Sequence, residues 1–315
     1  MNNANNELHV IFGTGPVGLT LADELIARGR RVRLVNRSGK AETSQDVEIV
    51  AADATDPAAV TALSEGAVAI YNCVNSVYSQ QYEMVPRFQK AILAAASVTG
   101  AKLIVTDSLY MYGVTHGVPM NEDTPYAPSS RKGEMRAQVA RDYLKAHADG
   151  VAQVALGRAA DFFGPRVFNS TFGERVFPLA LSGQPVQVMG NIDLPHPYSY
   201  MPDIARGLAT LGERPEAIGH EWLLPVAPTV TTREMLKLVE AAVGHPLEIQ
   251  TATREIIEHF GEFDEQMREF VEMFYQYEEP QIVDSSRFTE TFEWSATPLS
   301  EAIAATVDWF KALQK

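Results

Sequence analysis

The chain has 315 residues, of which 46% are hydrophobic and 9% aromatic, a composition typical of an ordinary globular protein with one large or two moderate domains. Its 26 Lys and Arg against 40 Asp and Glu give a formal net charge of −14, which argues against sequence-independent binding to nucleic acid or an anionic membrane. The single cysteine, Cys73, excludes an internal disulfide and suits a reducing cytoplasm, and no apolar run has membrane-spanning length. We therefore expect a cytoplasmic protein whose partner is a small-molecule substrate.

A short apolar run, Val10 to Phe12, is followed by three glycines in the G-x-G-x-x-G spacing and by a helical pattern from Pro16 to Gly29. This order is typical of a dinucleotide site, because a helix N-terminus offers free N–H donors and a positive dipole end to the pyrophosphate. A strand at Arg31 to Val35 completes a βαβ unit; a purely structural glycine turn is the alternative. The predicted cofactor-binding residues of the turn are Gly13, Thr14, Gly15, Pro16, Val17 and Gly18.

The loop after this second strand contains Asn36, Arg37 and Ser38 and no acidic residue. An acidic side chain here would hold the 2′-hydroxyl of NAD, whereas an arginine accommodates the 2′-phosphate of NADP. Because a guanidinium can pair with a phosphate through two charge-assisted hydrogen bonds, the sequence favours NADP over NAD. The alternative is that Arg37 is only a solvated loop charge.

Strands and helices then alternate, which predicts an α/β fold with a doubly wound parallel Rossmann sheet. The further strands are expected at Val47 to Ala51, Val68 to Val74, Lys102 to Thr106 and Ala152 to Gly157, with helices from Pro57 to Leu63, Gln81 to Val98 and Arg131 to His147. Ligands of such sheets bind where strands end, so cofactor contacts are also expected there. These residues are Asp53, which can accept a hydrogen bond from the adenine amino group, with Ala54, Val74 and Asn75.

The alternation changes after residue 165, where short strands mix with helices and many prolines. We expect a dinucleotide-binding Rossmann domain over 1–165 and a smaller mixed α/β domain for the substrate, mainly over 166–315. Segments near 196–212 and 298–315 are expected to return to the Rossmann body. Aromatic residues between Phe260 and Tyr277 form a stripe that reads as core packing, with a subunit contact or a lid as alternatives.

Four further segments stand out: Asp53 with Thr55-Asp56-Pro57, Ser108-Leu-Tyr-Met-Tyr-Gly, Gly157-Arg-Ala-Ala-Asp-Phe-Phe-Gly-Pro and Pro197-Tyr-Ser-Tyr-Met-Pro-Asp203. They resemble the extended short-chain dehydrogenase/reductase family of NAD-dependent epimerases, dehydratases and reductases, although the usual glycine spacing of that family would need a glycine at position 12, where this chain has Phe12. The resemblance implies hydride transfer between nicotinamide C4 and a carbinol or carbonyl carbon of a sugar-like or other polyol. It places Ser108 at the family's catalytic serine, which hydrogen-bonds the reacting oxygen. A homodimer through Gln81 to Val98 is a further expectation from the family.

The chain departs from the family at the Tyr-x-x-x-Lys pair, where the matching positions are Lys132 and Arg136. In the family, the tyrosine exchanges the proton, and the lysine lowers its pKa and holds the nicotinamide ribose. The resemblance therefore suggests Lys132 as a proton donor and cofactor ligand, and Arg136 as a ribose ligand. Tyr110, two residues after Ser108, and Tyr126 are alternative sources of a phenol. A solvated helix face is the structural alternative for Lys132 and Arg136.

Two functions follow from these residues. The first is an NAD(P)-dependent oxidoreductase or epimerase that acts on a sugar-like or other carbonyl or alcohol substrate, with catalytic residues Ser108, Tyr110 and Lys132 and no metal. The second is a catalytically inactive NAD(P)-binding sensor or regulatory partner protein, for which the missing tyrosine argues.

Overall fold

The structure is a computed structural model in which residues 7–43, 45 and 47–314 are described. The chain divides into two compact units, each assembled from three segments. Unit 1 consists of Met1–Ser108, Met135–Arg158 and Ile204–Leu224, and unit 2 of Leu109–Glu134, Ala159–Asp203 and Pro225–Lys315. Across the described residues, no helix combines the length and the apolar character needed to span a membrane.

The described part of unit 1 is built on one seven-stranded sheet in which all neighbouring strands are parallel. Its strands are β1 (Leu8–Phe12), β2 (Arg31–Asn36), β3 (Glu48–Ala51), β4 (Ala67–Asn72), β5 (Lys102–Asp107), β6 (Val154–Arg158) and β11 (Glu221–Leu223). Their order, β3-β2-β1-β4-β5-β6-β11, is the doubly wound Rossmann order with one added edge strand. The strand order reverses between β1 and β4, so the carboxyl ends of these strands form the crevice where such sheets bind ligands. The predicted fold class is confirmed.

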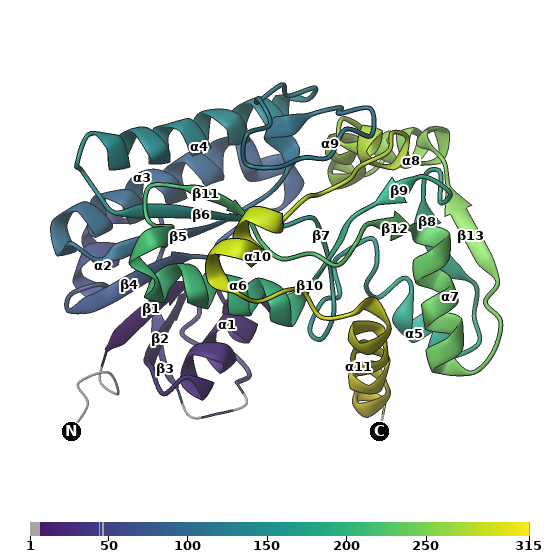
Figure 1. Cartoon of the computed structure of the whole chain (residues 1–315), viewed down its shortest axis with the longest axis horizontal. Helices are drawn as coiled ribbons and strands as arrows, with labels where there is room; N and C mark the ends of the chain where they lie inside the picture. Colours follow the sequence, from purple (N-terminus) through teal and green to yellow (C-terminus); the bar gives the residue numbers. More distant parts are fainter. Residues whose placement is uncertain (1–6, 44, 46, 315) are drawn as a thin grey trace. The chain divides into compact units, whose positions relative to one another are not determined.

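Helices cover both faces of this sheet (Figure 1). They are α1 (Pro16–Ala27), α2 (Pro57–Leu63), α3 (Gln81–Thr99), and the parts of α4 (Arg131–Ala148) and α6 (Met201–Glu213) that belong to unit 1, with short 3₁₀ turns η2 (Tyr78–Gln80) and η4 (Pro215–Ala217). Helices α2, α3 and α4 lie along one face, and α1 and α6 lie along the other. Arg28, which follows α1, fastens this second layer because its Nη1 lies 2.8 Å from Oε2 of Glu213 in α6.

The local signals in the sequence account for most boundaries in unit 1. Helix α1 begins at Pro16, whose missing N–H costs nothing in a first helical turn. Asp56 caps α2, because its carboxylate accepts the N–H groups of Ala58 and Ala59 at 2.9 and 3.4 Å. Gly100, with φ of +72°, ends α3 in a left-handed conformation. Each observed element lies within a few residues of its predicted range.

Unit 2 consists of helices and two-stranded ladders. The ladders pair β7 (Asp161–Phe163) with β10 (Tyr198–Tyr200), β8 (Val186–Met189) with β13 (Ile249–Ala252), and β9 (Pro195–His196) with β12 (Val230–Thr231). The helices are α5 (Phe177–Leu181), α7 (Thr232–Val243), α8 (Arg254–Gly261), α9 (Glu265–Val271), α10 (Ser286–Phe292) and α11 (Leu299–Leu313), with 3₁₀ turns η3 (Tyr110–Tyr112) and η5 (Phe274–Tyr277). Helix α7 starts with a capping box, in which Thr231 and Glu234 satisfy each other's backbone N–H groups.

The closing helix lies elsewhere than expected. Its apolar positions Ile303, Val307 and Phe310 are buried in a cluster with α5 and α7, all in unit 2. Residues 298–315 are thus assigned to unit 2, and Ile204–Glu213, within the other segment, is assigned to unit 1. The segment Leu109–Glu134 belongs to unit 2, although it lies between two segments of unit 1 in the chain. The division into units therefore does not fall at residue 165. Apolar periodicity predicted the helix, but it carries no information about the partner.

The aromatic stripe between Phe260 and Tyr277 spans the end of α8, all of α9 and η5. Phe270, Phe274 and Tyr277 are buried, as core packing requires, but Phe263 is 79% exposed. Asp264 interrupts the helix because it caps α9, where its carboxylate accepts the N–H groups of Gln266 and Met267.

Candidate active site

The glycine turn joins β1 to α1 in unit 1. Gly13 has φ of +107°, and a Cβ atom there would lie 2.6 Å from the Cys73 carbonyl oxygen. A Cβ on Gly18 would lie 2.0 Å from the Gly13 carbonyl oxygen, so this glycine lets α1 pack against the turn. A Cβ on Gly15 would meet nothing within 4 Å. The packing of the protein thus explains two of the glycines, and the third leaves open the space that a pyrophosphate needs to approach the backbone.

The N-terminus of α1 presents the donors that this site requires. Gly15 is the N-cap residue, and within the described structure no side chain caps the helix and no acid lies in its first turn, which contains Pro16 and the buried Val17. Thr14 is fixed by a hydrogen bond of 2.7 Å from Asn36 Nδ2 to its Oγ1. The first-turn N–H groups are left for an anionic ligand, so the residues present fit a dinucleotide.

The loop after β2 is organised by Asn36. Its Oδ1 accepts hydrogen bonds from the backbone N–H groups of Ser38 and Gly39 at 3.1 and 2.7 Å, and its Nδ2 donates to the Lys40 carbonyl oxygen. Arg37 is exposed in this loop. Asn36 therefore shapes the loop, and Arg37 is the cation that directly follows it in the chain.

Asp53 lies just beyond the carboxyl end of β3, beside the buried Ala54. Its Oδ1 accepts hydrogen bonds from the backbone N–H and the hydroxyl of Thr55, both at 2.9 Å. These hydrogen bonds lower the pKa of Asp53, with a smaller contribution from the charges of Arg87 and Arg37. The exposed carboxylate is therefore held in its ionised form and fixed by one oxygen.

Four charges alternate in sign around the carboxyl ends of β5 and β6: Asp107, Arg136 and Arg158 are buried, and Glu221, at the start of β11, is partly buried. Arg158 Nε lies 3.2 Å from Asp107 Oδ2, and its Nη2 lies 2.9 Å from Glu221 Oε2. Arg136 on α4 approaches the other oxygen of Asp107 at 3.9 Å and donates to Asn75 Oδ1 at 3.1 Å. Each charge has an opposite neighbour, which offsets the cost of burying it.

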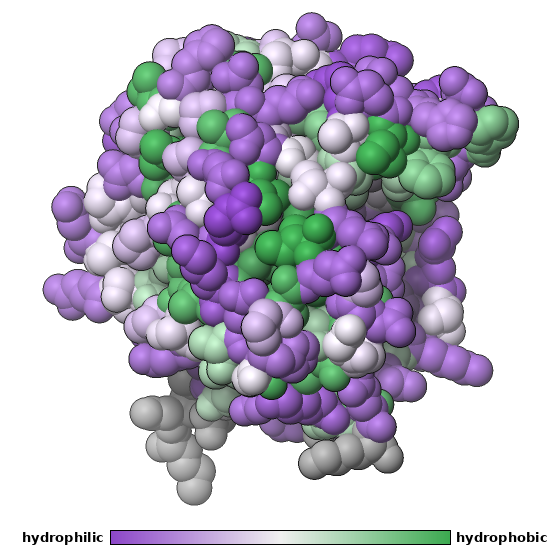
Figure 2. All heavy atoms as spheres, turned by 90° about the vertical axis from the view of Figure 1, so that its right-hand side faces the viewer, coloured by the Kyte–Doolittle hydropathy of each residue, from purple (hydrophilic) through white to green (hydrophobic). Residues whose placement is uncertain are grey.

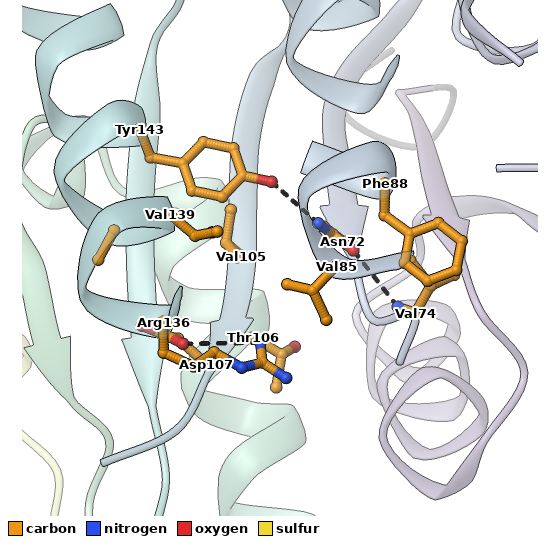
Figure 3. Close-up of a pocket in the computed structure, with 11 residues that line it drawn as sticks. Asn72, Val74, Val85, Phe88, Val105, Thr106, Asp107, Arg136, Val139 and Tyr143 are labelled. Atoms are coloured by element: carbon orange, nitrogen blue, oxygen red, sulfur yellow. Dashed lines mark hydrogen bonds and ion pairs between the residues drawn. The ribbon is translucent and has the colours of Figure 1, made fainter. Parts of the chain in front are cut away.

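This network borders a small cavity of about 10 Å³, the space of about one water molecule (Figure 3). Val74, Val105 and Val139 form its apolar wall, and Asn72 donates to the Tyr143 hydroxyl at 3.0 Å. Burial raises the pKa of Tyr143, so its phenol stays neutral. Of the residues that the sequence indicates for the cofactor, Val74 and Arg136 line this cavity, and Asn75 accepts a hydrogen bond from Arg136.

Seven buried side-chain polar atoms in the described part of unit 1 make no hydrogen bond. Two of them, Ser108 Oγ and Arg136 Nε, lie near the end of β5. An unsatisfied buried polar atom costs about 1–3 kcal/mol, so such atoms usually mark a ligand or water. Both residues follow or flank the end of β5, where Rossmann sheets bind their ligands. Their burial supports a hydrogen-bonding ligand at this strand end.

Lys132 belongs to unit 2, where its side chain is fully buried. Its ammonium donates to Glu269 Oε2 at 2.5 Å, to Glu272 Oε1 at 2.6 Å and to the Glu269 carbonyl oxygen at 3.1 Å. Glu272 also accepts the backbone N–H of Arg131 at 2.8 Å, at the first turn of α4. The alternative of a solvated helix face is therefore wrong for Lys132, and its ammonium is bound to structural carboxylates.

The candidate phenols also lie in unit 2. Tyr110 opens η3 and is partly buried, and its carbonyl oxygen would lie 2.5 Å from a Cβ on Gly133. Tyr126 packs its ring against the edge of the buried Tyr112, with the centroids 5.9 Å apart. Backbone contact thus holds Tyr110 beside the first turn of α4, whereas Tyr126 belongs to an aromatic pair.

A second polar cluster of unit 2, which the sequence analysis did not predict, is centred on Asp161. Its Oδ2 accepts hydrogen bonds from His196 Nε2, the Tyr277 hydroxyl and the Thr171 hydroxyl at 3.0, 2.7 and 3.1 Å. Burial raises the pKa of Asp161, but the hydrogen bonds and the charge of His196 outweigh it, and the net shift is downward. His196 Nδ1 faces the Gln276 carbonyl oxygen, so its ring meets both acceptors only with two N–H groups. Asp161 and His196 are polar residues within mostly apolar segments of the sequence, and this pattern could have indicated the cluster.

The profile of the NAD dependent epimerase/dehydratase family matches residues 10–224, and the chain belongs to this family. A dTDP-glucose 4,6-dehydratase of Streptomyces griseus is 24% identical over 230 residues, which are 70% of this chain. The chain spans 62% of the length of that relative.

Solved structures show the same fold. An epimerase from Methanothermobacter thermautotrophicus has a TM-score of 0.81 at 17% identity, with 99% of this chain and 94% of that chain covered. UDP-glucuronic acid 4-epimerase from Bacillus cereus, in complex with UDP-glucuronic acid and NAD, has a TM-score of 0.78 at 15% identity, with 97% and 99% covered. At these identities, the similarity establishes the architecture of the chain.

Proposed function

We propose that the chain is an NAD(P)-dependent oxidoreductase or epimerase that acts on a carbonyl or alcohol substrate. The observation that carries the proposal is the open Gly15 backbone at the uncapped N-terminus of α1. The orphaned hydroxyl of Ser108 supports it, because this hydroxyl can hydrogen-bond a reacting oxygen.

The residues of unit 1 account for the parts of a dinucleotide. The turn from Gly13 to Gly18 would hold the diphosphate, Asp53 would accept the adenine amino group, and Arg136 with Asn75 would hold the nicotinamide ribose. When bound, the nicotinamide ring supplies a hydride donor or acceptor. Ser108 orients the substrate oxygen, and a phenol exchanges its proton.

We assign that phenol to Tyr110 and a positioning role to Lys132. The ammonium of Lys132 is bound to two carboxylates and one carbonyl oxygen, so it has no donor directed at a substrate. Tyr110 follows Ser108 by two residues and is partly exposed. Tyr110→Phe would then abolish turnover and leave coenzyme binding intact.

The coenzyme preferred by the loop after β2 is NADP. Asn36 is engaged within the loop, and the exposed Arg37 is available for a 2′-phosphate. Arg37→Ala should weaken NADPH binding by about 10- to 100-fold and leave NADH binding unchanged, because hydrogen bonds to charged groups are worth about 1.5–3 kcal/mol. Arg31→Ala, an exposed change at the other end of β2, is the control. An unchanged preference in calorimetry would assign NAD.

Gly15→Ala tests the proposal at its centre. A methyl group at Gly15 meets no protein atom, and its φ of −74° suits alanine, so the melting temperature should not change. Coenzyme affinity should fall at least about tenfold, because the methyl group would occupy the space of the diphosphate. Full coenzyme binding by this variant would contradict the dinucleotide site.

The second function, an inactive sensor, is favoured by the replacement of the family's tyrosine by a buried lysine. A sensor would bind coenzyme but show no oxidation or reduction of it with any carbonyl or alcohol compound. Turnover that depends on Tyr110 would exclude it.

A further inference from the structure

One face of helix α4 lines the small cavity that borders the alternating charges of unit 1. Arg136, Val139 and Tyr143 occupy positions i, i+3 and i+7 of this helix, so their side chains lie on the same face. Figure 3 shows Arg136 and Tyr143 at opposite ends of this face, with Val139 between them. All residues that line the cavity belong to unit 1, so the cavity is defined within one compact unit.

Arg136 has a buried donor without an acceptor. Its Nε lies inside the protein and meets no hydrogen-bond acceptor among the residues that the structure describes. Its Nη2 donates to Asn75 Oδ1 at 3.1 Å, whereas its Nη1 lies 3.9 Å from Asp107 Oδ1, beyond hydrogen-bond distance. Polar side chains at the surface, which dominate the face in Figure 2, hydrogen-bond to solvent, but this buried nitrogen requires a partner inside the protein.

The opposite end of the cavity has polar groups that match this donor. Asn72 on β4 donates from Nδ2 to the Tyr143 hydroxyl oxygen at 3.0 Å, which leaves the phenolic O–H to donate elsewhere. Burial raises the pKa of Tyr143, so the phenol keeps this proton. Asn72 Oδ1 accepts only a long hydrogen bond, of 3.4 Å, from the Val74 N–H, and it has a lone pair left for a second donor.

The cavity has the size and the polarity of a site for a single water molecule. Its volume of about 10 Å³ accommodates one water and excludes larger ligands. Empty cavities in proteins are lined by apolar side chains, whereas this one has polar groups at both ends. A water there can accept hydrogen bonds from Arg136 Nε and from the Tyr143 O–H. It can donate to Asn72 Oδ1 at the same time, so it has the two to four partners that buried waters make.

We infer that one buried water occupies this cavity and bridges Tyr143 to Arg136, and that Tyr143 is thereby a positioning residue for the nicotinamide ribose of the coenzyme. The inference rests on the proposed function, in which Arg136 and Asn75 hold this ribose. The bridge fixes Nε and Asn75 fixes Nη2, so the planar guanidinium is oriented before the coenzyme binds. Its remaining N–H groups are then presented to the ribose hydroxyls, and less side-chain entropy is lost on binding.

Tyr143→Phe tests the positioning role, because it removes the hydroxyl and retains the ring. Calorimetry should show that the affinities for NADPH and NADH fall by the same factor, about threefold to tenfold, since both coenzymes contain the nicotinamide ribose. ADP, which lacks this ribose, should bind the variant and the wild type equally. Unchanged NADPH binding by the variant would overturn the inference, and so would an equal loss for ADP.

Tyr71→Phe is the matched control. Tyr71 precedes Asn72 in β4, so its side chain lies on the other face of the sheet, where its buried hydroxyl is 3.0 Å from His9 Nδ1. Both variants lose a buried hydrogen bond and should melt at a lower temperature than the wild type. Only Tyr143→Phe should weaken coenzyme binding. An equal loss of NADPH affinity in Tyr71→Phe would assign the effect to general destabilisation and would overturn the inference.

The water itself is tested by a high-resolution crystal structure of the coenzyme-free protein and by a cavity-filling variant. We expect electron density for one water within hydrogen-bond distance of Arg136 Nε and the Tyr143 oxygen. Val139→Ile adds a methyl group at the cavity wall and should weaken NADPH binding as Tyr143→Phe does, without a further loss in the double variant, because both remove the same bridge. A cavity without this density, or additive losses, would overturn the inference. Absence of NADPH binding by the wild type would instead contradict the proposed function.

Discussion

In unit 1, charges of alternating sign run from Arg136 on α4 to Asp107 on β5, Arg158 on β6 and the partly buried Glu221 on β11. In unit 2, the buried Lys132 lies against two carboxylates, within a unit in which 11 Lys and Arg against 24 Asp and Glu give a net charge of −13. In the first arrangement, the charges neutralise one another because neighbouring strands carry side chains of opposite charge. The second depends on a few cations that hold together segments far apart in the chain. Removal of the shared cation should be costly in both units, because Arg158 and Lys132 are each fully buried against two carboxylates.

The largest effect is expected for Lys132→Met. The substitution leaves Glu269 and Glu272 without their common cation, while their side chains are only 26% and 23% exposed. Breaking a buried pair in this way costs about 3–5 kcal/mol, and the partial exposure of the carboxylates places this variant near the lower end. Urea unfolding measures the loss.

Two variants sharpen this comparison. Lys145→Met removes an exposed lysine that pairs with Asp149 one helical turn away, and it should change stability by less than about 0.5 kcal/mol. Lys132→Met combined with Glu269→Gln and Glu272→Gln should recover part of the loss. If Lys132→Met alone unfolds at the wild-type urea concentration, the role assigned to its ion pairs is wrong.

A pH effect of similar size is expected in unit 1, from His9. Burial lowers the pKa of this ring to about 4, and its Nδ1 lies 3.0 Å from the Tyr71 hydroxyl. Because the unfolded chain takes up the proton near pH 6.5, the native state loses stability as the pH falls from about 6.5 to about 4, by about 3 kcal/mol. His9→Asn should make the urea midpoint less sensitive to pH in this window. An unaltered pH profile would contradict the assignment.

A smaller loss is expected for Asp161→Asn in unit 2. The carboxylate accepts three hydrogen bonds, and replacing it weakens them by about 1–3 kcal/mol in total. Since the pKa of Asp161 is shifted downward in the fold, its contribution is present above about pH 4 and disappears as the pH falls below that value. The variant should therefore be less stable than the wild type near neutral pH, and the difference should shrink in acid. Thermal unfolding of the variant and the wild type near neutral pH and below about pH 4 measures the difference in stability.

The smallest effect is expected for Phe263→Ser. The ring is 79% exposed within the acidic stretch of α8 and α9, so its replacement should change stability by less than about 0.5 kcal/mol. A drop of several degrees in melting temperature would show that this ring is covered in solution and that unit 2 has a contact beyond its own charges. Sedimentation of the variant would then identify a second copy.

The signals in the sequence that predicted structure act between residues close together in the chain. The glycine spacing, the Asp56 cap, the Thr231–Glu234 box and the apolar periods each act within a few residues, and the strands and helices of unit 1 agree with them. The environment of Lys132 could not be predicted in this way, because its two carboxylates lie 137 and 140 positions away. The same holds for Asp161, whose partner Tyr277 is 116 positions distant. Charge pairing over such separations leaves no periodic signal.

The ion pairs of Lys132 also restrict which side chains this position can accept. A tyrosine at this position would bury its phenol against two carboxylates that had lost their cation. Placing the family's tyrosine here would therefore require coordinated changes at Glu269 and Glu272 as well.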